Sequence, residues 1–205
     1  MAIPFPAVVE LPSVSIPISD GKSFKVHYLA PYYPKSTGAL ASEPDSVRLL
    51  DLKEAGAAGI RHYAAKLQVA LQGTRQAAVV VMPSHGVGCA SVTGGLRMAL
   101  KAIPGVADLS ACLVRHTAVA KASRAGPGQR PTAENHRDSM QVADQNRIRN
   151  QDVLLLDDVV TRGASMRGAR FVLLRAGAKS VTCLSLTRTM YAAPDSGEEE
   201  VEIPF

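Results

Sequence analysis

The chain has 205 residues, of which 46% are hydrophobic and 20% are charged, a composition typical of one globular domain of ordinary size. Only 4% of the residues are aromatic and none is Trp, so we expect an aliphatic core, as in a parallel sheet wrapped by helices rather than an aromatic-rich β-sandwich. The formal net charge of +5 suits a polyanionic ligand, either a small phosphate compound or a nucleic acid.

The cysteines and the N-terminus indicate a reducing compartment. Cys89, Cys112 and Cys183 lie far apart with no CxxC pair, so we expect neither a disulfide framework nor a zinc site. Residues 1–22 lack the basic start and the continuous apolar core of a signal peptide. No apolar run approaches the ~20 residues that span a membrane. We therefore expect a cytoplasmic protein with no membrane partner.

The N-terminal part predicts short strands and then a helix. Residues 13–18 and 24–29 are rich in β-branched side chains within a proline-containing stretch, which is typical of edge strands and turns. Apolar side chains then recur at helical spacing over residues 60–71, with Ser42 or Asp45 as a candidate N-cap.

From residue 77 onward the pattern alternates between strands and helices. Apolar runs predict strands at 77–82, 109–114, 151–156 and 181–186, and periodic segments predict helices at 96–103, 133–142 and 166–176, with a glycine-rich loop at 83–95 and a basic loop at 116–132. This alternation predicts an α/β fold in which helices flank a parallel β-sheet with right-handed crossovers.

The segment from Val153 to Ser165 carries the clearest functional pattern. Its four apolar residues predict a buried strand, and Asp157 and Asp158 follow at the strand's end, where open α/β sheets bind ligands. A Thr-x-Gly-x-Ser turn then opens a helix, and its hydroxyls, free N–H groups and helix N-terminus form a cradle for an anion. An acidic pair beside such a cradle predicts a ligand that carries both a phosphate and a polyol or metal ion.

This segment resembles the motif with which type I phosphoribosyltransferases bind 5-phosphoribosyl 1-diphosphate (PRPP). The resemblance implies that Asp157 and Asp158 are the catalytic pair, facing the ribose hydroxyls directly or as ligands of Mg²⁺. It also implies that the 5-phosphate is held by the turn, namely by Thr161, Arg162, Gly163, Ala164 and Ser165.

The resemblance extends over residues 77–190. Residues 82–86 occupy the place of the family's diphosphate loop, and the basic stretch 115–137 that of its flexible loop. The runs LVRHT and CLSLTRT, together with Lys121, Gly128 to Arg130 and His136 to Met140, are similar to orphan phosphoribosyltransferases and to the competence-protein F group. The residues expected to bind diphosphate are Pro83, Ser84, His85, Gly86, Arg115, Lys121 and Arg130.

The resemblance implies an N-terminal hood at residues 1–72, a phosphoribosyltransferase core at 73–190 and an acidic tail at 191–205. It implies a homodimer that transfers a phosphoribosyl group to a small nitrogenous acceptor, with Mg²⁺ as cofactor and diphosphate leaving. Thr161 stands where hypoxanthine-guanine enzymes carry an Asp that contacts the purine, which speaks against purine salvage and leaves the acceptor open.

Other functions have weaker support in the sequence. The LLLDD run is similar to a Walker B strand, but no GxxxxGK[ST] accompanies it, and Gly86 to Ser91 is only a partial dinucleotide-binding fingerprint. His85 and Cys89 share a loop and are a candidate nucleophile pair, although a small buried Cys beside an unrelated His is the simpler reading. The alternative function is a PRPP-sensing regulator or a nucleic-acid-associated partner protein with the same fold.

Overall fold

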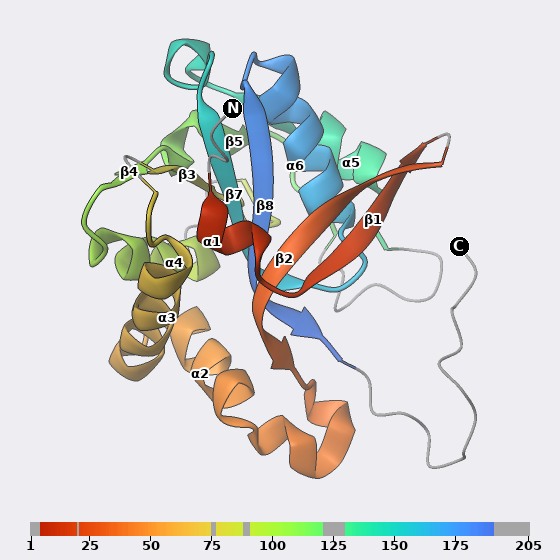
Figure 1. Cartoon of the computed structure of the whole chain (residues 1–205). Coiled ribbons are helices and arrows are strands. Elements are labelled where there is room, and N and C mark those ends of the chain that lie inside the picture. Colours follow the sequence, from red (N-terminus) through yellow and green to blue (C-terminus); the bar gives the residue numbers. More distant parts are fainter. Residues whose placement is uncertain (1–4, 20, 75–76, 88–90, 121–129, 191–205) are drawn as a thin grey trace.

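A mostly parallel central sheet flanked by helices forms the fold, which is mixed α/β as the sequence predicts (Figure 1). The computed structural model describes residues 5–19, 21–74, 77–87, 91–120 and 130–190. None of the helices in these ranges is both long and apolar enough to cross a membrane.

The central sheet has six strands in the order β1-β2-β8-β7-β3-β4. β1 pairs antiparallel with β2, and all the other neighbours are parallel. A separate antiparallel pair, β5 and β6, lies beside this sheet. The strands are β1 (Ser13–Ser19), β2 (Lys22–Tyr32), β3 (Ala77–Val81), β4 (Val106–Asp108), β5 (Leu113–Arg115), β6 (Met140–Val142), β7 (Asp152–Val160) and β8 (Ser180–Thr189).

The helices cover both faces of the sheet, with α3 and α4 on one face of β7 and β8 and with α5 and α6 on the other (Figure 1). The α-helices are α1 (Pro6–Val9), α2 (Pro44–Lys53), α3 (Ala57–Ala70), α4 (Ser91–Lys101), α5 (Ala133–Asp138) and α6 (Ala164–Arg175). The 3₁₀ helices are η1 (Lys35–Ser42), η2 (Ser110–Cys112) and η3 (Gln145–Arg147).

β7 divides the interior into two hydrophobic cores. Its side chains alternate between the faces of the sheet, so Leu154 and Leu156 join the core under α1 to α4, whereas Val153 and Leu155 join the core under α6. All four are fully buried, which explains why the run is continuously apolar. Residues before and after position 72 share the first core, and the division into a hood and a core domain stays a prediction.

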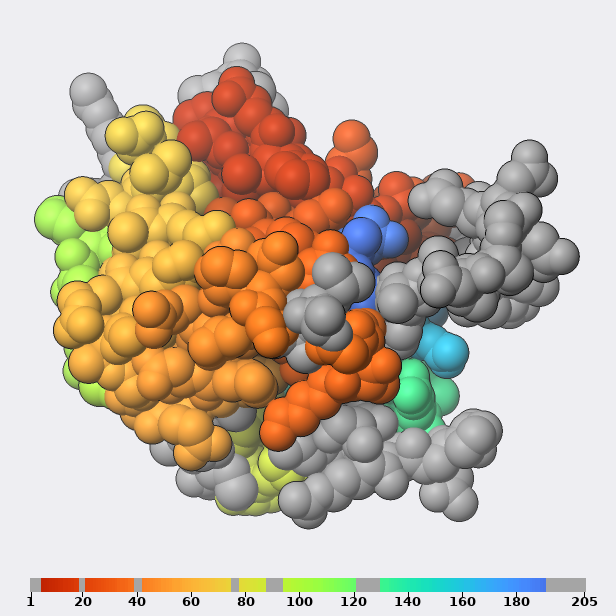
Figure 2. Space-filling view, turned by 90° about the horizontal axis from the view of Figure 1, so that it is seen from below, coloured from red at the N-terminus to blue at the C-terminus, as the bar shows by residue number. Residues whose placement is uncertain are grey.

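The carboxyl end of the sheet is covered by the segment between β2 and α3. Figure 2 views the molecule from this end and shows the orange residues of η1 and α2 across its middle. α2 is fixed there by its buried Leu49 and Leu52, and a side chain at Gly59 or Gly95 would collide with the backbone of Leu52. This close approach makes α2 a rigid cover over the strand ends.

Several predicted elements are confirmed, including the strands at 77–82 and 181–186 and the helices at 96–103 and 166–176. Gly177, which follows α6, has the positive φ of 95° expected of a residue that ends a helix.

The N-terminal predictions need two corrections. β2 is an interior strand between β1 and β8, so of these two strands only β1 lies at an edge of the sheet. The helix predicted at 60–71 is confirmed by α3, but the chain from Pro44 onward is split into α2 and α3, and neither Ser42 nor Asp45 is the N-cap of either helix. The split occurs because Ala55 adopts a positive φ and the Asp51 carboxylate accepts the Gly59 N–H at the start of α3.

Three central predictions are also wrong. The strand expected at 109–114 begins only at Leu113, as β5; residues 110–112 form the 3₁₀ turn η2, in which the Ser110 hydroxyl accepts the Val81 N–H. The helix expected at 133–142 ends at Asp138, and the residues that follow form β6. The strand expected to end at residue 156 continues to Val160, because β8 pairs with it along that length.

Candidate functional site

Asp157 and Asp158 lie on β7 where the sheet narrows at its carboxyl end. β3 pairs with β7 only as far as Leu156, whereas β8 pairs with it to Val160. The two carboxylates therefore lie within the strand and not after it, on a part of β7 that extends past β3 and is supported by β8. This corrects the sequence-based placement but keeps the pair at the ligand-binding edge of the sheet.

The two carboxylates contact opposite layers of the molecule, as the alternation of side chains along a strand requires. The Ser165 hydroxyl at the start of α6 lies 3.4 Å from Oδ2 of Asp157, to which it donates. On the other side, the Lys53 ammonium at the end of α2 lies 3.0 Å from Oδ2 of Asp158. The second oxygen of each carboxylate accepts the backbone N–H of the next residue, at 2.9 and 2.8 Å.

The surroundings of Asp157 disfavour its negative charge. Loss of hydration, followed by the neighbouring Asp158 carboxylate, raises the pKa of Asp157 well above its ordinary value. Burial on its own lowers the pKa of Lys53, but the attraction of Asp158 outweighs it and the pKa is raised. A carboxyl group with a strongly raised pKa beside a second carboxylate in a ligand-binding edge is a feature of functional sites.

The turn after β7 connects the strand to α6 through a left-handed glycine. Gly163 has φ 71° and ψ 12°, a left-handed conformation that suits glycine, and α6 begins at the next residue. A Cβ atom on Gly163 would lie 2.6 Å from Cδ1 of Ile16, so β1 packs directly against the turn. Thr161 shares a 2.7 Å hydrogen bond with Thr189 of β8 through their hydroxyls. Thr161 and Arg162 are exposed, whereas Ala164 and Ser165 are half-buried.

The predicted diphosphate loop, Pro83 to Gly86, follows β3 at the same edge and is held by Arg115. The Arg115 guanidinium is only 6% exposed; its Nε donates to the Ser84 carbonyl at 2.7 Å, and it also donates to the Ser139 hydroxyl. The backbone N–H of Val119 donates to the His85 carbonyl at 2.9 Å. Arg115 therefore supports the loop from below, while Arg130 is exposed and Lys121 lies outside the described residues.

His136 completes this support. Its Nδ1 lies 3.5 Å from the Arg115 guanidinium, which can only donate, so Nδ1 is the acceptor and the imidazole is neutral. Burial and the positive charge of Arg115 lower the pKa of His136 to about 4. Burial likewise lowers the pKa of Arg115, partly offset by Asp157. The acidic pair and the loop support are thus electrostatically linked.

Two residues of the site, Lys53 and Ile16, carry no sequence signal, and His136 and Ser139 are singled out in the sequence only through the resemblance. Lys53 belongs to the unmatched N-terminal part, and Ile16 reads as an ordinary strand residue. His136 and Ser139 fall in the segment expected to be a single helix, and they meet Arg115 only because the chain turns at Ser139 into β6. The expected Cys89 lies outside the described residues.

A divalent cation fits this site only with ligands from outside the protein. Asp157 and Asp158 offer the hard oxygen donors that Mg²⁺ prefers. Among the described residues, however, no three His, Cys, Asp or Glu side chains converge on one point. The site therefore suits a cation that keeps water molecules and takes further oxygens from a phosphorylated ligand, as Mg²⁺ commonly does.

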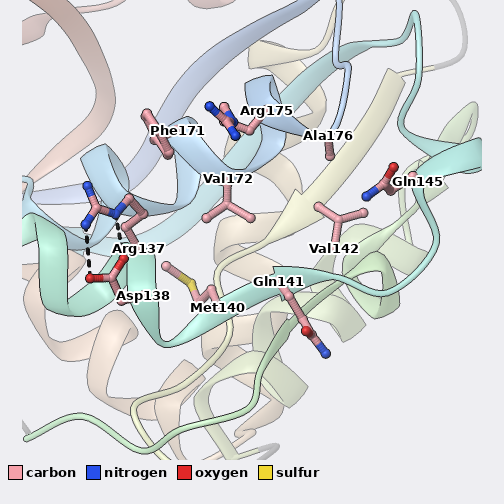
Figure 3. Close-up of a pocket in the computed structure, with 10 residues that line it drawn as sticks. All are labelled: Arg137, Asp138, Met140, Gln141, Val142, Gln145, Phe171, Val172, Arg175 and Ala176. Carbon is pink, nitrogen blue, oxygen red and sulfur yellow. Dashed lines mark hydrogen bonds and ion pairs between the residues drawn. The ribbon is translucent and has the colours of Figure 1, made fainter.

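A hollow of about 570 Å³ lies elsewhere, between α5, β6 and α6. In Figure 3, Val172 and Val142 point toward one another across it, with Phe171 at its rim. The guanidinium groups of Arg137 and Arg175 lie 5.6 and 5.9 Å from the centre of the Phe171 ring. A second hollow of about 250 Å³ lies on the other side of Phe171, and none of the described predicted site residues lines either one.

Comparisons with known proteins give only a distant likeness. No protein-family model and no curated protein matches the chain. Among solved structures, the chain is similar to a hypoxanthine phosphoribosyltransferase from Staphylococcus aureus, with a TM-score of 0.38 and 14% sequence identity over 69% of this chain and 74% of that one. The likeness is weak, and we base the function on the residues of the site.

Proposed function

We propose that this protein binds PRPP with Mg²⁺ and transfers the phosphoribosyl group to a nitrogen acceptor, with diphosphate as the leaving group. The observation that supports this most directly is the pairing of two elements within one short segment. A carboxylate pair with a raised pKa at Asp157 lies next to a left-handed glycine turn that opens α6. The first element suits ribose hydroxyls, and the second suits a phosphate.

In this proposal the protein's residues act mainly by positioning. The N–H groups and hydroxyls from Thr161 to Ser165 bind the 5-phosphate, and Asp157 and Asp158 orient the ribose. When bound, Mg²⁺ neutralises the diphosphate as it departs. The loop Pro83 to Gly86 lies next to the diphosphate, and Arg115, engaged below it by the Ser84 carbonyl, keeps its backbone in place. α2 shields the reacting centre from water.

The acceptor remains open in this proposal. Thr161 does not supply the carboxylate that a purine base would use at this position, so we favour a non-purine nitrogen compound. The homodimer expected from the resemblance stays a prediction.

The decisive experiment is calorimetric titration of PRPP into the protein with saturating Mg²⁺. We expect binding in the micromolar range, lost in the double variant Asp157→Asn, Asp158→Asn. Asp152→Asn is the matched control, because Asp152 is a carboxylate on the same strand but at its opposite end, paired with Lys179 and Ser180. No binding to the folded wild-type protein, or equal loss in the control, refutes the proposal. An acceptor screen by diphosphate release follows if binding is found.

A second candidate, a regulator that senses PRPP and binds single-stranded nucleic acid, has one observation in its favour. On the outer face of α6, Arg170 lies 5.0 Å from the centre of the Phe24 ring, and Arg137 and Arg175 flank Phe171. Within the described residues, neither Arg170 nor Arg175 forms an ion pair with a carboxylate. Arginines interleaved with aromatic rings suit phosphates and stacked bases.

Fluorescence anisotropy with a labelled oligonucleotide tests this candidate. Binding should weaken steeply with salt, and the double variant Arg170→Ala, Arg175→Ala should weaken it further. Absence of binding at low salt eliminates the candidate and leaves the enzyme.

A further inference from the structure

Among the described residues, Lys53 is the one that forms an ion pair with the acidic pair, and it belongs to α2, far from β7 in the sequence. Its ammonium lies 3.0 Å from Asp158, within electrostatic range of Asp157, and 5.9 Å from the centre of the Tyr32 ring. The Lys53 side chain is 29% exposed and the Asp158 side chain 16% exposed. The ammonium therefore lies at the partly exposed surface of the site.

The position of α2 does not depend on this ion pair. Leu49 and Leu52 are buried in the core, and the glycines at 59 and 95 allow the backbone of Leu52 to approach closely. The Ser46 hydroxyl accepts the backbone N–H of Tyr33 at 2.9 Å, which fastens the start of α2 to the end of β2. Since these contacts fix the helix, the Lys53 side chain can change its partner while its backbone stays in place.

A divalent cation at Asp158 is incompatible with the ammonium in its present position. The repulsion between a doubly charged cation and an ammonium that share one carboxylate is several times what a partly exposed ion pair contributes. The ammonium would therefore leave Asp158 when the cation arrives. The displaced ammonium would then pair with the negative charge of the phosphorylated ligand that accompanies the cation.

We propose that Lys53 and a divalent cation alternate at Asp158, and that the displaced ammonium then binds the anionic part of the ligand. Lys53 thus acts as the counter-ion of the acidic pair before binding and as a ligand-binding residue afterwards. This inference rests on the proposed function for the identity of the ligand, PRPP, but the exchange at Asp158 can be measured without it.

The experiment measures the affinity for Mn²⁺, as a substitute for Mg²⁺, by the electron paramagnetic resonance signal of the free ion, first without PRPP. We expect Lys53→Met to bind Mn²⁺ about tenfold more tightly than the wild type, because the competing charge is gone. Lys53→Arg retains the charge and should bind like the wild type. Lys66→Met is the matched control, since Lys66 forms a similar 2.9 Å ion pair with Asp45 at 32% and 19% exposure, on α3.

PRPP is then titrated at saturating Mn²⁺. Lys53→Met should bind PRPP about tenfold more weakly, whereas Lys66→Met should match the wild type. Unchanged or weaker Mn²⁺ binding in Lys53→Met overturns the exchange, and unchanged PRPP binding overturns the ligand contact. If the wild type binds no PRPP while Lys53→Met still tightens Mn²⁺ binding, the proposed function fails but the exchange at Asp158 stands.

Discussion

The turn that we assign to the 5-phosphate should tolerate no side chain at position 163. Gly163→Ala places an L-residue at a φ of 71°, where the left-handed conformation costs about 1–2 kcal/mol. It also brings a Cβ atom within 2.6 Å of Cδ1 and 2.8 Å of Cγ1 of Ile16, and overpacking of this kind costs about 1–3 kcal/mol. Together the two effects predict a loss of about 2–5 kcal/mol in the free energy of unfolding.

Gly21→Ala separates the two effects. Gly21 has the same φ of 71°, but no atom lies within 4 Å of the position that its Cβ atom would occupy. The loss in the free energy of unfolding of Gly21→Ala should therefore contain the backbone cost alone. The change in the entropy of the unfolded chain is common to both variants. The difference between the two variants isolates the contact with Ile16, which we expect to be about 1–3 kcal/mol.

Urea denaturation followed by circular dichroism measures these differences, provided that the dependence of the unfolding free energy on urea is equal among the variants. In a double-mutant cycle, Ile16→Ala should relieve the contact. The double variant should therefore lose less stability than the sum of the losses in the two single variants, by about 1–3 kcal/mol. Equal losses for Gly163→Ala and Gly21→Ala, together with full additivity, would refute the packing of β1 against the turn.

Three further predictions concern the loop support and the turn. Arg115→Lys keeps the charge but loses the guanidinium's several donors, and it should lower the free energy of unfolding by about 2–3 kcal/mol in urea. His136 has a pKa of about 4 in the folded protein against 6.5 ordinarily, so the unfolded chain takes up its proton first on acidification. Stability should therefore fall from pH 6.5 toward pH 4, by at most about 1.4 kcal/mol per pH unit, and His136→Gln should remove that part of the slope; identical slopes contradict the assignment. Thr161→Val should weaken PRPP binding about tenfold in calorimetry, whereas Thr189→Val, which removes the other hydroxyl of the pair, should leave it nearly unchanged.

The sequence predicted the parts of the fold that local pattern determines. The apolar run of β7 and the glycine after α6 each identified an element directly, because burial on both faces and a positive φ leave few residue choices. The α/β class followed from the alternation of predicted strands and helices after residue 77. Predictions failed where a tertiary contact decided the structure, as at Ser110, whose hydroxyl accepts the Val81 N–H in the turn that precedes β5.

The site shows the same division. Asp157, Asp158 and the glycine turn are contiguous in sequence, so their pattern was visible. Lys53 and His136 reach the site from segments far away in the chain, and each depends on a chain direction that no local pattern encodes. The role predicted for Arg115 was contact with diphosphate, whereas its burial beneath Ser84 indicates support for the loop, a distinction that only the fold reveals.

β7 extends past the end of β3, and this has a consequence for chains that share the segment. A strand that extends past its neighbour exposes backbone N–H groups that invite pairing with another molecule. Here the side chains of Asp157 and Asp158 accept the N–H groups of Asp158 and Val159, and since successive N–H groups of a strand point to opposite edges, one of these two carboxylates satisfies an N–H group at the edge that β3 leaves open. A descendant that had lost all turnover would still have a structural reason to keep that acid. The acidic pair alone is therefore a poor marker of activity, and the glycine turn with its Ile16 contact is the better one to follow.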